Sequence, residues 1–361
     1  MKQDEPKGFQ IGNREIGQDK EVYFIADIAA NHDGDLDRAK ELIHLAAEAG
    51  ADAAKFQHFQ ASTIVSQVGF DSLGNDVVSH QSTWEQSVSE VYQNASVSLE
   101  WSEALRGTCA DAGVDFFTTP YSFSLADAMD EYVPAYKIGS GDITWIELIE
   151  HIAAKGKPYI LATGASTLDD VVRAVEAGTK INNDFCLMQC NTNYTGDLEN
   201  LKYVNLNVLR TYKEMFPNIL LGLSDHTPGH ATALGAITLG ARMIEKHFTD
   251  DTSRSGPDHK FSMDPTSWRE MVLRSRELES ALGVGVKRVE FNELSASIVQ
   301  RRSIRVRNNV AVGAVLTREN LDVLRPCPEG AIQPHEIGAV LGQKVKVGIS
   351  AGEHLTWKHI V

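Results

Sequence analysis

Short apolar runs alternate with amphipathic segments through most of the chain. The apolar runs occupy residues 22–29, 53–57, 115–120, 135–141, 159–164, 185–190, 220–226 and 243–249. The segments between them repeat apolar residues at helical spacing, as in 36–49. Eight strand–helix repeats predict an α/β protein with a (β/α)8 or TIM barrel. A doubly wound sheet is disfavoured because no G-x-G-x-x-G loop follows the first strand.

Two segments depart from this repeat. Residues 9–17 centre on Gly12 and Asn13 and predict a β-hairpin, which we place beneath the barrel floor before the first strand. Residues 74–101 are longer than a usual connection between strand and helix. We expect them to form an insertion near the entrance to the site.

The pattern changes after Gly283. Residues 283–297 are polar and predict a linker, whereas 298–361 contain short β-type pieces punctuated by Gly, Asn and Pro. We therefore expect a barrel domain over 1–282 and a small β-rich domain over 298–361.

Composition narrows the class of protein. A net charge of −15 and a pI near 5.2 make nucleic acid an unsuitable partner. An anionic substrate would need a locally basic site within this acidic chain. The four cysteines form no C-x-x-C pair, which predicts reduced thiols and a cytoplasmic protein. The first twenty residues are polar, and no apolar run is long enough to span a membrane.

The apolar runs end in polar side chains. These positions are Asp27, Lys55, Gln57, Thr119, Lys137, Ser140, Asp142, Thr192, Tyr194, Ser224, His226, Glu245 and His247. In a (β/α)8 barrel the active site lies at the carboxyl ends of the strands, so we expect these side chains to meet there.

Two histidines end the last two predicted strands. Residues two apart in a strand share a face, so Ser224 points with His226, and Glu245 points with His247. Because those strands are neighbours in a barrel, His226 and His247 could bind one divalent ion with water and substrate oxygens completing its shell. The alternative is a pair of neutral histidines held by hydrogen bonds.

Two lysines occupy positions where a buried cation is costly without a negative partner. Lys55 and Lys137 predict a site for a phosphate or carboxylate ligand. The alternative is an internal ion pair with Asp27, Asp142 or Glu245. The two arrangements are compatible, because the carboxylates can pair with the lysines while the site is empty. Lys246 alternates with His247 and should point outward.

Several longer motifs resemble the sialic acid synthase family. They are "FIADIAANHDGDLDRAKELIHLAAEAGADAAKFQ", "PAYKIGSGD", "GLSDHT", "EKHFT" and "GPDHKFSM". The stretch "QRRSIRVRNNVAVGAVLTRENLDVLRP" is similar to that family's antifreeze-like (SAF, β-clip) domain. The resemblance covers essentially the whole chain.

The resemblance implies a reaction and its participants. Phosphoenolpyruvate would condense with an open-chain N-acetylated hexosamine-type sugar to give a nine-carbon 2-keto-3-deoxy acid and phosphate. The family uses a divalent metal, usually Mn²⁺ or Mg²⁺, and Co²⁺ is a further candidate. It forms a homodimer in which each antifreeze-like domain covers the partner's barrel.

Matching the motifs position by position assigns site residues. His226 and His247 would bind the metal. Phosphoenolpyruvate would contact Lys55, Gln57, Thr119, Lys137, Ser140, Thr192 and Ser224. The sugar would contact Tyr194, Asp258 and, from the neighbouring subunit, Arg325.

The chain departs from the family pattern at four positions. Asp27 and Asp142 stand where the family has glutamate, so each carboxylate is one methylene shorter. Ala162 replaces a serine that binds phosphoenolpyruvate, and Thr192 replaces an asparagine. These changes either tune or impair the activity.

Our mechanistic hypothesis is metal-assisted carbon–carbon bond formation. The ion would polarise the sugar's aldehyde oxygen, and Asp27 and Asp142 would orient groups or move protons. Lys55 and Lys137 would neutralise the phosphate and carboxylate. One rival is a Schiff-base aldolase that uses a lysine nucleophile. Another is a non-catalytic sugar sensor that kept the barrel.

The acceptor sugar stays open at this point. N-acetylmannosamine, a 2,4-diacetamido-trideoxy sugar and mannose are all compatible with the motifs. We expect selectivity to reside in residues 58–100, in 191–195 and in the antifreeze-like domain.

Overall fold

The structure is a computed structural model that describes residues 6–73, 81, 84 and 86–361. Part of the predicted insertion, at 74–80, 82–83 and 85, lies outside the described residues. The chain divides into two compact units, Met1–Gly283 and Val284–Val361. Among the described residues, none of the helices has the length and apolar character needed to cross a membrane.

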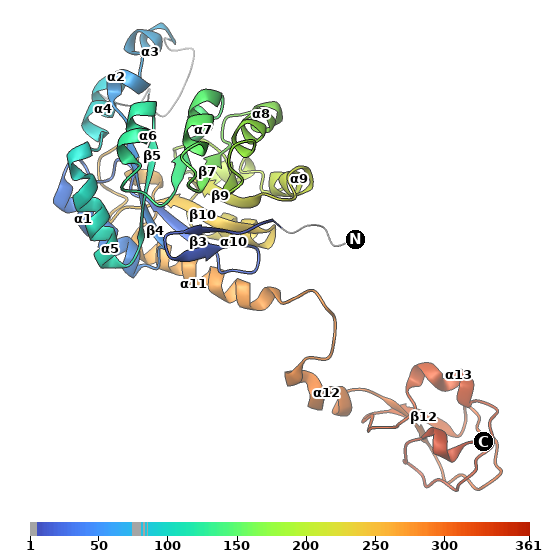
Figure 1. The fold of residues 1–361 in the computed structure, drawn as a ribbon. Helices are drawn as coiled ribbons and strands as arrows, with labels where there is room; N and C mark the ends of the chain where they lie inside the picture. The colour runs from blue at the N-terminus through green and yellow to red at the C-terminus, as the bar shows by residue number, and fades with distance from the viewer. Residues whose placement is uncertain (1–5, 74–80, 82–83, 85) are drawn as a thin grey trace. The chain divides into compact units, whose positions relative to one another are not determined.

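The first unit is a closed barrel of parallel strands surrounded by helices (Figure 1). Its strands, in the order in which they close the ring, are β10 (Ala241–His247), β3 (Tyr23–Asp27), β4 (Ala53–His58), β5 (Asp115–Pro120), β6 (Tyr136–Ile138), β7 (Tyr159–Ala162), β8 (Phe185–Cys190) and β9 (Leu220–Asp225). All eight coincide with predicted apolar runs, and the predicted TIM barrel is confirmed. Both faces of each strand are buried because the lumen packs one and the helices pack the other.

Helices connect the strands. They are α1 (Leu36–Glu48), α2 (Ala61–Ile64), α3 (Gln67–Leu73), α4 (Val88–Ala95), α5 (Ser102–Ala112), α6 (Phe123–Met129), α7 (Ile146–Ala153), α8 (Leu168–Thr179), α9 (Val208–Met215), α10 (Ala231–Thr238) and α11 (Pro265–Leu282). Most of them, apart from α2, α3 and α4, pack an apolar stripe against the barrel. In α1 the Asp35 carboxylate caps the first turn by accepting from two backbone N–H groups. The insertion begins directly after β4, earlier than the predicted 74–101, and contains α2, α3 and α4.

The predicted N-terminal hairpin closes the bottom of the barrel. Strands β1 (Phe9–Ile11) and β2 (Arg14–Ile16) pair antiparallel around Gly12 and Asn13. Phe9, Ile11 and Ile16 join the lumen cluster formed by the barrel strands. Among the described residues, the hairpin therefore closes the lumen at the amino ends of the strands.

The second unit has its own core. Strands β11 (Ser303–Val306) and β12 (Leu321–Leu324) pair antiparallel, and α13 (Ile337–Val340) packs with them. Isolated bridges such as Val310 to Ile349 extend the β structure. The residues predicted as a linker include a short 3-10 turn, Phe291–Glu293, and most of α12 (Leu294–Val299).

Candidate active site

Strand register brings the predicted polar residues to one end of the barrel. Asp27 pairs with Lys55 on one side and with His247 on the other. Gln57 pairs with Thr119, and Glu245 pairs with Ser224. Side chains alternate between the two faces of each strand, so these residues point to the same face as the residues nearer the amino ends of the strands that fill the lumen.

Lys55 and Asp27 form a buried ion pair. Lys55 Nζ lies 2.6 Å from Asp27 Oδ2 and 3.2 Å from Thr119 Oγ1, and both charged side chains are almost fully buried. Gln57 Nε2 donates to the same Asp27 oxygen at 3.0 Å. The shorter aspartate side chain at position 27 therefore reaches Lys55 directly.

Glu245 balances the second lysine. Its Oε1 lies 3.3 Å from Lys137 Nζ and 3.9 Å from Lys55 Nζ, and it accepts from Ser224 Oγ at 3.2 Å. Its Oε2 is buried without a hydrogen-bond partner among the described residues. Glu245 is one of the strand-end residues predicted to meet at the site, and it forms the internal ion pair with Lys137 that the sequence left open as an alternative.

The carboxylates keep Lys55 charged. Burial alone would lower the pKa of Lys55, but Asp27 and Glu245 outweigh it and raise that pKa above its ordinary value. The site thus holds two lysines and two carboxylates at its base. An incoming dianion could take over the lysines at little electrostatic cost because the cations are already in place.

His226 and His247 meet at the wall of the same site. Their ring centroids are 5.3 Å apart. His226 Nδ1 lies 3.1 Å from the carbonyl oxygen of Asn191, so Nδ1 carries the proton and donates. His247 Nε2 lies 3.5 Å from Asp27 Oδ2, and its Nδ1 is buried without a hydrogen-bond partner in the described structure.

This pair fits a divalent ion with two protein nitrogen ligands. With Nδ1 engaged by the Asn191 carbonyl, the neutral form of His226 has its lone pair on Nε2, the atom that would bind a metal. Burial, followed by the neighbouring His226 and Lys55, lowers the pKa of His247 well below its ordinary value and keeps that ring neutral. Among the described residues, no group of three or more His, Cys, Asp or Glu side chains is arranged to hold a metal. Water and substrate oxygens would have to supply the other ligands.

A second group of hydroxyls converges beside β7. Ser140 Oγ accepts from the Gly164 backbone N–H at 2.9 Å. A Cβ at Gly164 would lie 1.8 Å from Thr192 Oγ1, so only glycine allows this approach. The Thr192 hydroxyl is itself buried without a partner within the described structure. Ala162 lies in the lumen cluster, so the position that differs from the family's serine does face the site.

Two further acids line the site at its upper end. Burial raises the pKa of Asp142 to about 6 and that of Asp258 to about 6. Asp258 Oδ2 accepts from the Ala30 backbone N–H at 3.0 Å, which holds it beside the first βα loop. Both carboxyls can therefore exchange protons near neutral pH.

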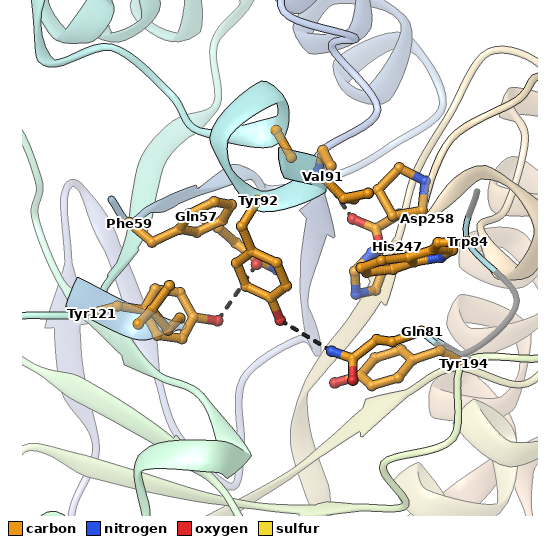
Figure 2. Close-up of a pocket in the computed structure, with 14 residues that line it drawn as sticks. Gln57, Phe59, Gln81, Trp84, Val91, Tyr92, Tyr121, Tyr194, His247 and Asp258 are labelled. Carbon is orange, nitrogen blue, oxygen red and sulfur yellow. Dashed lines mark hydrogen bonds between the residues drawn. The ribbon is translucent and has the colours of Figure 1, made fainter. Parts of the chain in front are cut away.

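An aromatic pocket adjoins the histidines (Figure 2). The open cavity of about 710 Å³ is lined by Ala30, Gln57, Phe59, Ile64, Gln81, Trp84, Val91, Tyr92, Ala95, Tyr121, Tyr194, His247, Pro257 and Asp258. Tyr194 lies edge-on to His226 at 4.5 Å between ring centroids. Figure 2 shows Tyr92 projecting from α4 into this pocket. The individual residues of α4 were not predicted, because only the position of the insertion suggested that it lies near the site.

Two predicted positions lie elsewhere. Arg325 follows β12 in the second unit, outside the barrel's own residues. Lys246 points away from the lumen, as its alternation with His247 predicted, but it is buried rather than solvated. It forms an ion pair with Asp225, which also accepts from Thr227 and Thr232 at the start of α10.

The chain is similar to known proteins over nearly its full length. It is 34% identical to the N,N'-diacetyllegionaminic acid synthase of Legionella pneumophila, over 97% of each chain. It is 31% identical to the human N-acetylneuraminate-9-phosphate synthase, over 93% of this chain and 92% of that protein. The crystal structure of the N-acetylneuraminic acid synthetase of Leptospira borgpetersenii, in complex with citrate, matches with a TM-score of 0.70 and 27% identity, over 81% of this chain and 95% of that one.

Family models agree with these relatives. The SAF domain model matches residues 301–361, and the NeuB family model matches residues 42–287, which cover most of the barrel. With a barrel of this topology, the predicted residues gathered at its mouth and matches of this extent, the chain belongs to the NeuB family.

Proposed function

We propose that the protein condenses phosphoenolpyruvate with an open-chain N-acetylated hexosamine-type sugar. The products would be a nine-carbon 2-keto-3-deoxy sugar acid of the sialic, legionaminic or pseudaminic type, and phosphate. The observation that carries this proposal is the juxtaposition of Lys55 and Lys137 with His226 and His247 at the barrel mouth. The names of the relatives, which include legionaminic and pseudaminic acid synthases, support the same reaction.

The two lysines would receive phosphoenolpyruvate. In the free protein Lys55 pairs with Asp27 and Lys137 pairs with Glu245. The phosphate and carboxylate of the ligand would share these cations, and the hydroxyls of Thr119, Ser140 and Ser224 would donate further hydrogen bonds. Ala162 lacks the hydroxyl of the family's serine. Ser140 and Thr192, which lie around Gly164, offer hydroxyls in the same part of the site.

The bond changes assign roles to the acids. Carbon 3 of phosphoenolpyruvate would attack the sugar's aldehyde carbon. The aldehyde oxygen would gain one of the two protons given up by the water that adds at carbon 2, and the other proton would leave with phosphate. Water would add to carbon 2, and the resulting tetrahedral centre would release phosphate by cleavage of its carbon–oxygen bond. Asp142 could take a proton from that water. Asp27 would position the Lys55 ammonium so that it stabilises the negative charge that develops in the transition state.

His226 and His247 would hold a divalent ion, Mn²⁺ or Mg²⁺. When bound, such an ion supplies Lewis-acid polarisation of an aldehyde oxygen. The histidines contribute its position, because one ring is oriented by the Asn191 carbonyl and the other lies beside Asp27.

The Schiff-base alternative has less support. A lysine nucleophile must lose its proton, yet the carboxylates around Lys55 raise its pKa. Reduction with borohydride in the presence of an oxo substrate distinguishes the two reactions. We expect no covalent adduct on Lys55 or Lys137 by mass spectrometry, whereas the aldolase reaction requires one.

The central test is phosphate release. Purified protein with Mn²⁺ and phosphoenolpyruvate should release phosphate only when a suitable sugar is added. The panel comprises N-acetylmannosamine, a 2,4-diacetamido-trideoxy hexose and mannose. Sugar binding without phosphate release from any member would instead favour the non-catalytic sensor.

Asp142 should set an acidic limit to the reaction. Its pKa of about 6 means that the carboxylate needed by a general base is lost as the pH falls through 6. We expect Asp142→Asn to lower kcat by about 10²–10⁴-fold and to remove that limb from the pH profile. Asp258→Asn is the matched control, because that acid has a similar pKa but a proposed role in sugar binding. A limb retained in Asp142→Asn and lost in Asp258→Asn would transfer the role to Asp258.

Arg325 should act in trans in a homodimer. We propose that Arg325, next to Pro326, contacts the sugar held by a neighbouring protomer's barrel. Mixing Arg325→Ala protein with His226→Ala protein and allowing subunits to exchange should restore activity, because one of the two sites then has an intact barrel and an intact arginine. Absence of recovery in verified heterodimers would remove this role.

A further inference from the structure

We propose that the acceptor is an uncharged sugar, without a phosphate ester or carboxylate, whose far half packs against aromatic side chains of the insertion after β4. This inference rests on the proposed function and specifies its second substrate. It concerns the pocket defined above by its fourteen lining residues, hereafter the acceptor pocket.

The acceptor pocket has no cationic side chain of lysine or arginine at its described walls. Its described lining includes neither lysine nor arginine, and its one carboxylate is Asp258. The sequence itself contains no lysine or arginine between Lys55 and Arg106, a span that includes every residue of the insertion. A phosphate ester at the far end of this pocket, away from the proposed metal on His226 and His247, would lose hydration without gaining a lysine or arginine of this wall, which is costly.

The surrounding charges add to this cost. After burial, which is the larger cause, the negative charge of Asp142 contributes to raising the pKa of Tyr92 and of Tyr121. The lysines at the base of the site are already paired with Asp27 and Glu245, and phosphoenolpyruvate would claim them. One arginine contributed by a neighbouring protomer would offset only part of a phosphate's charge beside Asp258.

Aromatic rings form the wall that would face the far half of the sugar. Phe59 lies 5.2 Å from Tyr92 and 5.9 Å from Tyr121, between ring centroids, and Trp84 lies 6.4 Å from Tyr92. Helix α4 presents Val91 and Tyr92 on the side that lines the pocket (Figure 2). Such a surface favours methyl and acetamido substituents and the C–H faces of a sugar.

The polar groups of the wall are neutral hydrogen-bonding groups. Burial raises the pKa of Tyr92 and of Tyr121, so both phenols stay protonated. Tyr121 Oη donates to Gln57 Oε1 at 3.4 Å, and Gln81 Nε2 lies 3.5 Å from Tyr92 Oη. Phenols and amides of this kind match hydroxyl and amide groups of a neutral ligand.

Sequence identity to the relatives does not decide this question. The human relative is named for a 9-phosphate product and is 31% identical, while the Legionella relative is named for a product without phosphate and is 34% identical. The lining of the acceptor pocket is therefore the observation that selects the uncharged class.

The test compares kcat/KM for neutral and phosphorylated acceptors. Phosphate release from phosphoenolpyruvate is measured with N-acetylmannosamine, its 6-phosphate and a 2,4-diacetamido-2,4,6-trideoxy hexose. We expect the better neutral sugar to exceed the 6-phosphate by at least about tenfold. A 6-phosphate that reacts as well as or better than both neutral sugars would overturn the inference and leave the proposed function standing. No release with any of the three would contradict the proposed function itself, and this inference with it.

A charge placed on the wall should reverse the preference. Val91 is half-buried at the pocket, and Val91→Lys should raise kcat/KM for the 6-phosphate by about tenfold and lower it for the neutral sugars. Val68→Lys is the matched control, because Val68 lies on α3 in the same insertion, is 80% exposed and does not line the pocket. Equal changes in both variants would attribute the effect to overall charge and contradict the proposed wall. Circular dichroism checks that each variant is folded.

Discussion

Lys55→Met is expected to reduce phosphate release by about 10²–10³-fold and to destabilise the protein by about 3–5 kcal/mol. The activity falls because the ligand's negative charge loses a fixed, water-shielded cation. The stability falls because Asp27, almost fully buried, loses the ammonium 2.6 Å from its carboxylate. The measurements are steady-state phosphate release at low temperature and chemical unfolding of the same preparations.

Two further variants separate catalysis from stability. Lys246→Met breaks a comparable buried pair, with Asp225, on the helix side of the barrel wall. It should cost similar stability while leaving kcat nearly unchanged wherever the protein stays folded. The double variant Asp27→Asn with Lys55→Met removes both charges and should recover stability but not activity. An inactive Lys246→Met protein that is fully folded would show that loss of a buried pair, rather than of a site cation, explains Lys55→Met.

Removal of divalent metal is expected to abolish phosphate release. Lewis-acid stabilisation is worth several kcal/mol, so a loss of at least about 10³-fold should follow dialysis against EDTA, with recovery on adding Mn²⁺, Mg²⁺ or Co²⁺. A binding readout independent of activity is thermal stability, because an ion that binds only the folded chain raises Tm. This rise in Tm should occur when Mn²⁺ is added in the absence of phosphoenolpyruvate and sugar.

The histidine variants locate the ion. His226→Ala and His247→Ala should each lose both the activity and the Mn²⁺-dependent rise in Tm. His44→Ala, at an exposed position on α1, should lose neither. Full activity in protein shown by elemental analysis to be metal-free would exclude the role proposed for these histidines.

Hydrophobic periodicity was sufficient to predict the barrel. Each apolar run in the sequence is a strand because both of its faces are buried, and the intervening stripes are helices that cover one side. Strand-end polarity likewise predicted the residues around Lys55 and Lys137, since a strand's alternation decides which side chains share the lumen.

Only the tertiary structure decided how those residues pair. Asp27 was a candidate acid, and the register of β3 against β4 sets it beside Lys55, with which it pairs. Glu245 instead reaches across the lumen and forms an ion pair with Lys137. Neither distance follows from spacing, because it depends on where the closed barrel sets strands that are remote in sequence.

The acceptor pocket shows the same division most clearly. Its insertion could be recognised by length, and its lack of lysine and arginine can be read from the sequence. That Tyr92 meets Phe59 and Trp84 in the pocket that His247 also lines depends on how α4 packs against α2, which no local periodicity encodes. Local propensity and alternation determine elements and faces, whereas contacts between loops are determined by the packing of the whole barrel.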